Sequence, residues 1–462
     1  MSSGSPVLSK DGRAALFRRG PVALLVGVEN VAVLRGDPET LARALDAPDD
    51  DPDDAIRAIR EALAQPLASP PDARQPAVVQ LNIGNTSRCN MRCSYCYNAL
   101  PNKVTGRDMT PELARAAVDA LLENADDLDE VALVFIGGES LLQRELLEQT
   151  VAYADRRCRA RDKDLAVVVY TNGVLMDRDV IEWSNDTGVS LVVSLDGPPA
   201  LHDRHRVFPS GKPTSNAVLK NIEQLVARTN QPLRRVRAVA AEREALLPLH
   251  EYLYDLGFNE IQVQAAYGPT GYEGRDEMPD LQALAAWYRS LLLAGVVISV
   301  HPIVPVLERL QLRGASILNW HPCNAGFSAL GVDGDGDIYP CHHFFGEASY
   351  RFGNIRDGIP DIAARRPYFA RVVDREGCRG CWARYLCGGE CYHRTATGGH
   401  GYTGVVEEWC RTKRAIIEEA VDLFSVVAER RPHVLEELLD LELGIPAMNP
   451  QAYTLEDLDP YL

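Results

Sequence analysis

The stretch that best indicates the fold is LNIGNTSRCNMRCSYC, residues 81–96. In it, an apolar run that predicts a strand leads into three cysteines. Cys89, Cys93 and Cys96 have C-x3-C-x2-C spacing within one short loop. A structural zinc site has four protein ligands and no open coordination position, so three thiolates are one too few. They suit an iron–sulfur cube in which three irons are tied to protein and the fourth stays open for another ligand. The alternative is a loop of ordinary buried thiols.

Seven further cysteines gather in the last third of the chain, and Cys158 stands apart from both sets. The seven are Cys323, Cys341, Cys378, Cys381, Cys387, Cys391 and Cys410. Between the first two, the sequence Asp333-Gly334-Asp335-Gly336 predicts a hairpin. A zinc ribbon made by the four cysteines from 378 to 391 would leave the other three without a role. Iron–sulfur ligation is therefore the better hypothesis.

The bulk composition is that of an ordinary globular protein, with 462 residues, 46% of them hydrophobic, and a formal net charge of −17. A negative charge argues against a nucleic-acid partner, because phosphate binding needs a basic face. No apolar run approaches the roughly 20 residues that span a bilayer, so we expect no membrane partner. Eleven cysteines without a signal peptide predict a reducing, cytoplasmic location and metal ligation in place of disulfides.

Residues 1–76 predict a small N-terminal α+β subdomain and a Pro-rich linker. Residues 1–20 are polar, and we expect them to be poorly ordered. Two strands, 22–26 and 31–34, precede two helices, with Asp37 as the N-cap of the first helix. This order resembles the leader-recognition modules fused to peptide-modifying enzymes. A subdomain without such a role is the equal alternative.

Residues 77–300 alternate short apolar strands with helices, which is typical of a parallel sheet with helical crossovers. The predicted strands are 78–83, 131–136, 166–170, 190–195, 236–240 and 261–265. Six units are too few for a closed eightfold barrel, so the predicted fold class is α/β, with a partial (β/α)6 TIM-like barrel. Ligands of such sheets gather at the carboxyl ends of the strands. Residues 301–412 would form a C-terminal Cys-rich domain, and 413–462 a helical tail divided at Pro432.

The C-x3-C-x2-C loop, with Tyr95 just before its last cysteine, resembles the radical S-adenosylmethionine (SAM) superfamily. The second cysteine set, with its hairpin and the following Gly353-Asn354-Ile355, resembles the SPASM auxiliary-cluster domain. The first resemblance implies a [4Fe-4S] cluster on Cys89, Cys93 and Cys96 whose open iron binds SAM. It also implies that reduction, by a flavodoxin-type donor or other reductase, yields a 5′-deoxyadenosyl radical that takes hydrogen from a substrate.

The resemblance assigns SAM contacts to residues at the strand ends. These are Tyr95, Gly137, Gly138, Glu139, Asn172, Ser194 and Arg206. The Gly-Gly-Glu segment would contact the SAM ammonium group. Ser194 and Arg206 would contact the carboxylate or ribose side of SAM. Asp196 would act on the ribose or on the substrate as a catalytic residue. We expect His202 and His205 to be exposed loop residues, and Gln264 to point into the site.

The SPASM pattern, carried over residue by residue, implies two auxiliary iron–sulfur clusters. The outer cluster would be held by Cys378, Cys381, Cys387 and Cys410, and the inner cluster by Cys323, Cys341 and Cys391. Relatives with a fully ligated inner cluster have an eighth cysteine near the position of Ile317 in this chain. We therefore predict an inner cluster with one open iron, or with a non-cysteine ligand such as His321. An open iron would suit binding of a substrate thiolate.

The residue after Cys341 helps to choose among the activities that the resemblance implies. Sulfatase-maturing relatives place an Asp there as a proposed base, whereas this chain has Cys341-His342. The same Cys-His pair occurs in thioether-forming maturases of Cys-rich peptides and of the quinohemoprotein amine dehydrogenase small subunit. His342 would accept a proton near neutral pH. The equal alternative is that His342 donates a hydrogen bond to a sulfur.

We therefore expect a radical SAM oxidoreductase that modifies a ribosomally made precursor peptide or a small protein. The modification we favour is a thioether cross-link. The alternatives are a formylglycine-forming sulfatase maturase and a maturase that forms carbon–carbon or carbon–oxygen cross-links. A non-enzymatic scaffold stabilised by zinc is the alternative of a different class.

Replacing Cys93 by Ala would remove one of the three ligands expected for the SAM-binding cluster. We expect Cys93→Ala to abolish 5′-deoxyadenosine formation and to lower the iron content by about four atoms per chain. Both quantities are measured on anaerobically reconstituted protein, with Cys158→Ala as the matched control. Turnover that persists in Cys93→Ala would contradict the assignment.

Overall fold

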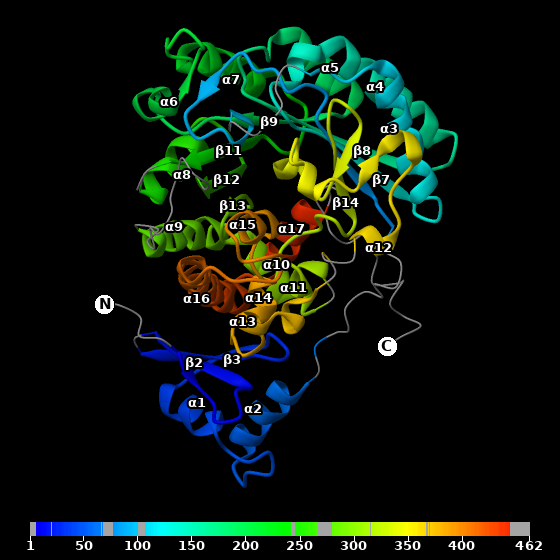
Figure 1. The fold of residues 1–462 in the computed structure, drawn as a ribbon. Helices are drawn as coiled ribbons and strands as arrows, with labels where there is room; N and C mark the ends of the chain where they lie inside the picture. Colours follow the sequence, from blue (N-terminus) through cyan, green and yellow to red (C-terminus); the bar gives the residue numbers. More distant parts are fainter. Residues whose placement is uncertain are drawn as a thin grey trace.

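The computed structural model describes residues 6–19, 21–65, 67, 77–99, 107–241, 245–266, 280–314, 316–365, 368 and 370–443. In Figure 1 the N-terminal unit lies at the bottom, the main sheet with its helices at the top, and the C-terminal helices between them.

The N-terminal unit is a four-stranded antiparallel sheet in chain order, followed by two helices. Its elements are β1 (Val7–Leu8), β2 (Ala14–Arg19), β3 (Val22–Gly27), β4 (Val33–Gly36), α1 (Pro38–Leu45) and α2 (Asp54–Ala64). Asp37 caps α1, as predicted, by accepting a hydrogen bond from the Thr40 N–H. The expectation that residues 1–20 are poorly ordered was wrong for the described residues 6–19, because they include β1 and β2.

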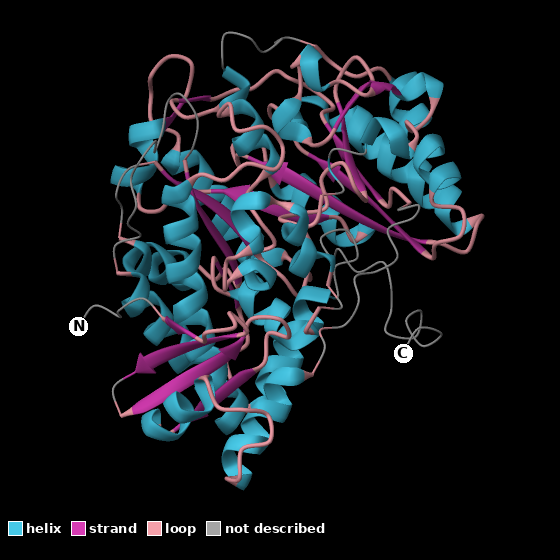
Figure 2. Cartoon of the chain, turned by 60° about the horizontal axis from the view of Figure 1, so that its bottom comes forward, coloured by secondary structure: helices cyan, strands magenta, loops and turns pink. Residues whose placement is uncertain are grey.

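Both faces of β2 are buried, and successive side chains point to opposite sides of the sheet. Ala14 and Leu16 pack against α1 and α2, whereas Ala15 and Phe17 join the core of the main body. The Phe17 ring meets Trp382 edge-on at 4.9 Å. Arg19 forms a 3.0 Å ion pair with Glu419. The N-terminal sheet is therefore docked on the C-terminal part of the chain, and Figure 2 shows this sheet beside helices.

The main sheet has ten strands in the order β13-β12-β11-β9-β8-β7-β5-β14-β15-β16. The bounds are β5 (Gln80–Ile83), β7 (Glu130–Phe135), β8 (Asp164–Thr171), β9 (Ser190–Ser194), β11 (Arg235–Ala240), β12 (Glu260–Ala265), β13 (Ser299–His301), β14 (Ala329–Val332), β15 (Asp337–Tyr339) and β16 (Gly353–Asn354). All six predicted strands are present within this sheet. It is parallel from β13 to β14, and β15 and β16 are antiparallel additions. The described strands form no closed barrel, in agreement with the predicted partial barrel.

Helices cover the outer face of this sheet in Figure 1. They are α3 (Pro111–Asn124), α4 (Arg144–Arg159), α5 (Arg178–Thr187), α6 (Pro199–His205), α7 (Ser215–Arg228), α8 (Leu246–Asp255) and α9 (Leu281–Leu293). Alternate strand residues such as Leu133 and Phe135 join the large core under the helices, whereas Val134 and Val168 form a small inner cluster. Cys158 is buried in the large core on α4.

The C-terminal part joins the N-terminal unit to the main sheet. Its helices are α10 (Val304–Leu312), α11 (Ile317–Trp320), α12 (Ile362–Arg365), α13 (Glu376–Arg379), α14 (Arg384–Cys387), α15 (Tyr392–Thr397), α16 (Glu407–Arg430) and α17 (Pro432–Leu443). Helix α16 contacts α9, α10 and β4, so it bridges the three regions. The predicted division of the tail at Pro432 is confirmed, and residues 444–462 lie outside the described residues.

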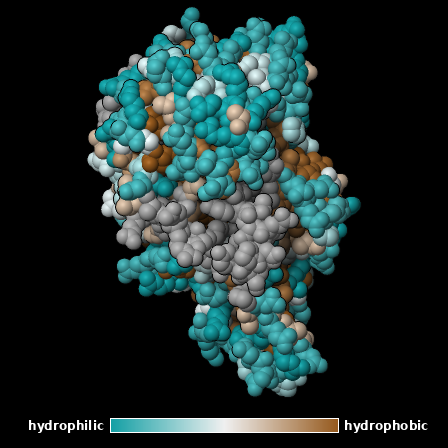
Figure 3. Space-filling view, turned by 90° about the vertical axis from the view of Figure 1, so that its right-hand side faces the viewer, coloured by the Kyte–Doolittle hydropathy of each residue, from teal (hydrophilic) through white to brown (hydrophobic). Residues whose placement is uncertain are grey.

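The coloured part of the face in Figure 3 is mainly hydrophilic, with small hydrophobic areas on the two sides of its upper part. Within the described residues, no helix combines the length and apolar character that a membrane span requires.

Phe17→Ala should weaken the docking of the N-terminal sheet, because this 4% exposed ring fills the contact with Trp382. We expect the free energy of unfolding to fall by about 3 kcal/mol. Urea unfolding measures it, with Val7→Ala, at a position 55% exposed, as the matched control. An equal effect of the two substitutions would contradict the docking.

Candidate functional site

The strands of the main sheet end at an open pocket with a volume of about 190 Å³. Its wall is built by the cysteine loop, by the ends of five strands and by the Cys-rich domain. The predicted site residues on the wall are Cys89, Cys93, Cys96, Tyr95, Gly137, Gly138, Asn172, Ser194, Arg206, Gln264 and His342. The structure thus brings together residues that the sequence spreads over more than 250 positions.

The Gly-Gly-Glu segment holds the backbone of the cysteine loop. The Gly138 N–H donates to the Thr86 carbonyl at 2.9 Å, and the Glu139 N–H donates to the Arg88 carbonyl at 2.8 Å. A Cβ atom on Gly138 would lie 2.0 Å from the Arg88 carbonyl oxygen, so only glycine permits this approach. The contact of this segment with the SAM ammonium group stays a prediction.

The Glu139 side chain lies behind the pocket wall and is fully buried. Its carboxylate accepts hydrogen bonds from the Thr171 hydroxyl at 2.8 Å and from the Asn172 N–H at 2.7 Å. Burial raises the pKa of this carboxyl. Glu139 thus fixes the end of β8, and Asn172 in turn donates to the Asn90 side chain in the cysteine loop at 2.7 Å.

Asp196 and Arg206 form a buried ion pair beside the cysteine loop. The Arg206 Nε donates to Asp196 Oδ2 at 2.9 Å, and the Tyr95 hydroxyl donates to the same oxygen. The other oxygen accepts from the Val239 N–H at 2.9 Å. Arg206 Nη1 lies 3.9 Å from Cys93 Sγ. The pair therefore positions the loop, and Asp196, 2% exposed, acts on the pocket through Arg206 and Tyr95.

His202 is buried, so the prediction of an exposed loop residue was wrong. The Asp196 N–H donates to its Nδ1 at 3.3 Å, and its Nε2 faces the Thr214 hydroxyl at 3.1 Å. Burial, reinforced by nearby Arg206, lowers the pKa of His202 to about 4. His205 is half-buried and its Nδ1 contacts the Ser94 hydroxyl at 2.8 Å. His205 thus contacts the cysteine loop directly, whereas His202 contacts the backbone of Asp196, whose side chain accepts from Tyr95 of that loop.

His342 reaches the pocket from the Cys-rich domain, directly after Cys341. Its ring centroid lies 4.3 Å from that of His343 and 5.9 Å from that of Tyr97. Tyr97 follows Cys96, and its ring centroid is 4.6 Å from that of His343, so an aromatic contact joins the two cysteine sets. His343 and Tyr97 were missed by the sequence analysis, although both adjoin residues that it assigned.

The three cysteines predicted for the inner cluster lie near one another. Burial, and then the nearby Cys391, raises the pKa of the Cys323 thiol to about 12. Burial, followed by Cys391 and Cys323, likewise raises the pKa of the Cys341 thiol. His321, the suggested non-cysteine ligand, contacts the hydroxyl of Tyr392 through its Nδ1 at 3.2 Å and lies against the Phe327 ring. Ligation by His321 and an open iron both stay predictions.

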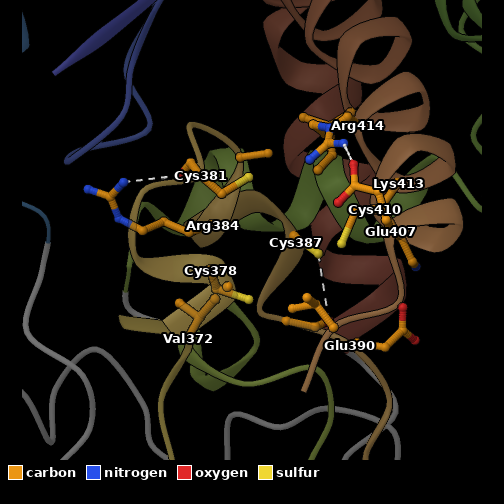
Figure 4. Close-up of a pocket in the computed structure, with 15 residues that line it drawn as sticks. Val372, Cys378, Cys381, Arg384, Cys387, Glu390, Glu407, Cys410, Lys413 and Arg414 are labelled. Atoms are coloured by element: carbon orange, nitrogen blue, oxygen red, sulfur yellow. Dashed lines mark hydrogen bonds and ion pairs between the residues drawn. The ribbon is translucent and has the colours of Figure 1, made fainter. Parts of the chain in front are cut away.

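The four cysteines predicted for the outer cluster line one cavity of about 40 Å³, shown in Figure 4. They are Cys378, Cys381, Cys387 and Cys410. Cys410 comes from the first turn of α16, so a helix far along the chain completes the set. Burial, followed by the neighbouring Cys387, raises the pKa of Cys378 to about 11 and that of Cys410 to about 12.

These donor sets fit iron–sulfur clusters better than single metal ions. Within the described residues, no three His, Cys, Asp or Glu side chains converge closely enough for one ion. A cluster is larger than an ion, and the outer thiols surround a cavity. All eleven cysteines are free, and burial opposes the ionisation of those at the sites, such as Cys93 and Cys378. Iron would supply the positive charge that a set of buried thiolates needs.

Comparison with known proteins agrees with this geometry. Residues 85–263 match the radical SAM superfamily, and residues 323–382 match the SPASM iron–sulfur cluster-binding domain. A serine-type anaerobic sulfatase-maturating enzyme of Bacteroides thetaiotaomicron is 24% identical over 352 residues, which cover 68% of this chain and 83% of that protein.

Two solved structures share the fold. Native anSMEcpe with bound AdoMet superposes with a TM-score of 0.64 at 20% identity, covering 76% of this chain and 99% of that one. Streptococcus suis SuiB bound to precursor peptide SuiA gives a TM-score of 0.50 at 14% identity, covering 85% of this chain and 97% of that one.

The fold and the cysteine sites together define an iron–sulfur enzyme that uses SAM. More particularly, the chain is a radical SAM enzyme that carries a C-terminal SPASM domain. The SPASM match ends at residue 382, and the structure adds Cys387, Cys391 and Cys410 to the same region.

The buried His202 predicts a pH-dependent stability. Its folded pKa of about 4 lies below the ordinary value of 6.5, so the unfolded chain binds the proton first as the pH falls. The contribution of His202 to the free energy of unfolding is fully present above pH 6.5, and it decreases by about 2 kcal/mol when the pH falls to about 5. We expect His202→Gln to lose less stability than the parent between about pH 7 and 5, as measured by urea unfolding. Parallel losses in both proteins would contradict a buried neutral His202.

Proposed function

We propose that this enzyme is a maturase that installs thioether cross-links in a ribosomally made peptide. The observation that carries the proposal is the shared pocket. Its wall includes the three cysteines of the SAM-cluster loop and, from the SPASM domain, His342 next to Cys341. A peptide in this pocket would lie between the cysteine loop and the histidines that follow Cys341.

The reaction needs a C–H and an S–H bond to break and a C–S bond to form. Bound SAM and the clusters supply the radical that takes the hydrogen atom and the acceptor for the remaining electron. The chain itself must receive the thiol proton. His342 is our candidate acceptor, because an imidazole titrates near neutral pH and this one lies on the pocket wall.

The other wall residues orient the reactants. Arg206 and Tyr95, both anchored on Asp196, fix the cysteine loop. Asn172 connects β8 to the same loop. A rigid wall holds the reacting atoms close together, which is a large part of what an enzyme supplies in radical chemistry.

A peptide substrate is supported by the similar structures, which include anSMEcpe with bound peptides and SuiB with a precursor peptide. Formylglycine formation remains the second candidate, because the matches to the named sulfatase-maturating relatives cover most of the length of those proteins. The histidine after Cys341 favours the thioether. A leader-binding role for residues 1–76 and a flavodoxin-type donor stay hypotheses.

The test is anaerobic coexpression with the product of the small open reading frame next to the gene, followed by mass spectrometry. We expect a loss of two hydrogens per cross-link and fragments joined through sulfur. Conversion of a Cys or Ser to an aldehyde would instead establish the sulfatase-maturase activity. An unmodified peptide, despite SAM cleavage, would overturn the proposal for that peptide class.

His342→Gln separates the proton acceptor from the cofactor site. We expect 5′-deoxyadenosine formation to persist, while cross-linking slows by about 100-fold, the lower range for a general base. His433→Gln, on the exposed surface of α17, is the matched control. Unchanged cross-linking in His342→Gln would assign the proton to another group.

A further inference from the structure

Arg237 is a pocket residue that the sequence analysis did not assign. It lies on β11, half-buried, and it contributes to the pocket wall with Gln264. Its Nη2 donates to the side-chain oxygen of Gln264, and its guanidinium lies 5.6 Å from the Tyr170 ring centroid. These two neighbours orient the guanidinium without neutralising it.

The charge of Arg237 has no carboxylate partner among the described residues. Two other arginines nearby differ in this respect, since Arg206 is paired with Asp196 and Arg235 with Glu260 at 2.8 Å. A half-buried guanidinium keeps several N–H donors in a planar fork that matches a carboxylate. A pocket cation with a neutral amide beside it is thus suited to an anionic ligand.

Its position favours the peptide as the source of that anion. Arg237 lines the same pocket as Tyr97, which follows Cys96 in the cysteine loop, and as His342 and His343. Tyr97 also contacts His342 and His343 of the SPASM domain. Arg237 therefore lies toward the part of the pocket between the cysteine loop and Cys341, which a substrate must enter to meet both.

We propose that Arg237, oriented by Gln264, binds the carboxylate of an acidic side chain in the peptide substrate. This inference rests on the proposed peptide maturase function and adds a specificity to it. A protein with a net charge of −17 repels an acidic peptide at long range, so recognition of a carboxylate requires a local cation. The methionyl part of SAM carries a carboxylate too, and the experiment must distinguish the two sources.

The probes are two fluorescently labelled peptides with blocked termini, Gly-Cys-Gly-Gly-Glu-Gly and the same sequence with Gln in place of Glu. Their anisotropy is measured with anaerobic, reconstituted, SAM-loaded enzyme. We expect the Glu peptide to bind about tenfold more tightly, as for a charge-assisted hydrogen bond. The ratio of the two dissociation constants, Gln peptide over Glu peptide, should approach one in Arg237→Gln. It should approach one in Gln264→Glu as well, because a resident carboxylate would occupy the guanidinium.

Arg228→Gln removes one positive charge from the exposed end of α7 and should leave the ratio unchanged. Arg237→Lys should retain part of the preference. The affinity for SAM should change less than about threefold in each variant, and iron content and melting temperature exclude misfolding. A ratio near one in the parent, including no binding of either peptide at millimolar concentration, would overturn the inference.

Two further outcomes would also overturn it. The first is an unchanged ratio in Arg237→Gln. The second is a tenfold loss of SAM affinity in that variant with the ratio intact, which would identify the SAM carboxylate as the ligand. The assay measures binding without turnover, so a failure to find thioether products would leave its result unaffected.

Discussion

The buried ion pair between Asp196 and Arg206 ties the cysteine loop to the sheet. Arg206 lies opposite Cys93 in the short pairing of β10 (Arg206–Val207) with β6 (Arg92–Cys93), and its side chain also approaches the Cys93 sulfur. Two charges taken out of water are tolerated only when their geometry is good and their other polar atoms are bonded. Asp196 meets this condition with three donors, and removing one partner of such a pair costs about 3–5 kcal/mol. The position of the SAM-cluster loop depends on this pair.

The SPASM domain is a continuation of the main sheet. Strand β14 pairs in parallel with β5, which leads into the cysteine loop, and β15 leads into Cys341. Phe345 fills the space over Gly84 and Gly331, where any added Cβ would lie 2.7 Å from its ring. The separation of the two cysteine sets is therefore fixed by hydrogen-bonded strands and close packing. The two cysteine sets thus belong to one continuous sheet.

Much of this arrangement could be predicted from the sequence, because hydrophobic periodicity and cysteine spacing are local signals. The six strands and both cysteine groups followed from them. Residues 14–17 were missed as a strand, because a short run buried on both faces shows no polar alternation. His202 was missed because it lies on the short helix α6, and its burial depends on contacts from Thr214 and Asp196 that no local periodicity indicates. The union of β14 with β5 is likewise a long-range pairing.

Arg237 illustrates the same limit in electrostatics. Arg235 and Arg237 are two residues apart on β11, so both side chains point to the same side of the sheet. Arg235 lies opposite Glu260 on β12 and is neutralised by it at the start of the strand. Arg237 lies opposite Gln262 on β12 and meets Gln264, two residues further toward the pocket, which offers an amide in place of a second carboxylate. Among the described residues, β11 thus carries one cation paired with a carboxylate and one cation that meets only neutral side chains, and the identity of the neighbour on β12 separates the two.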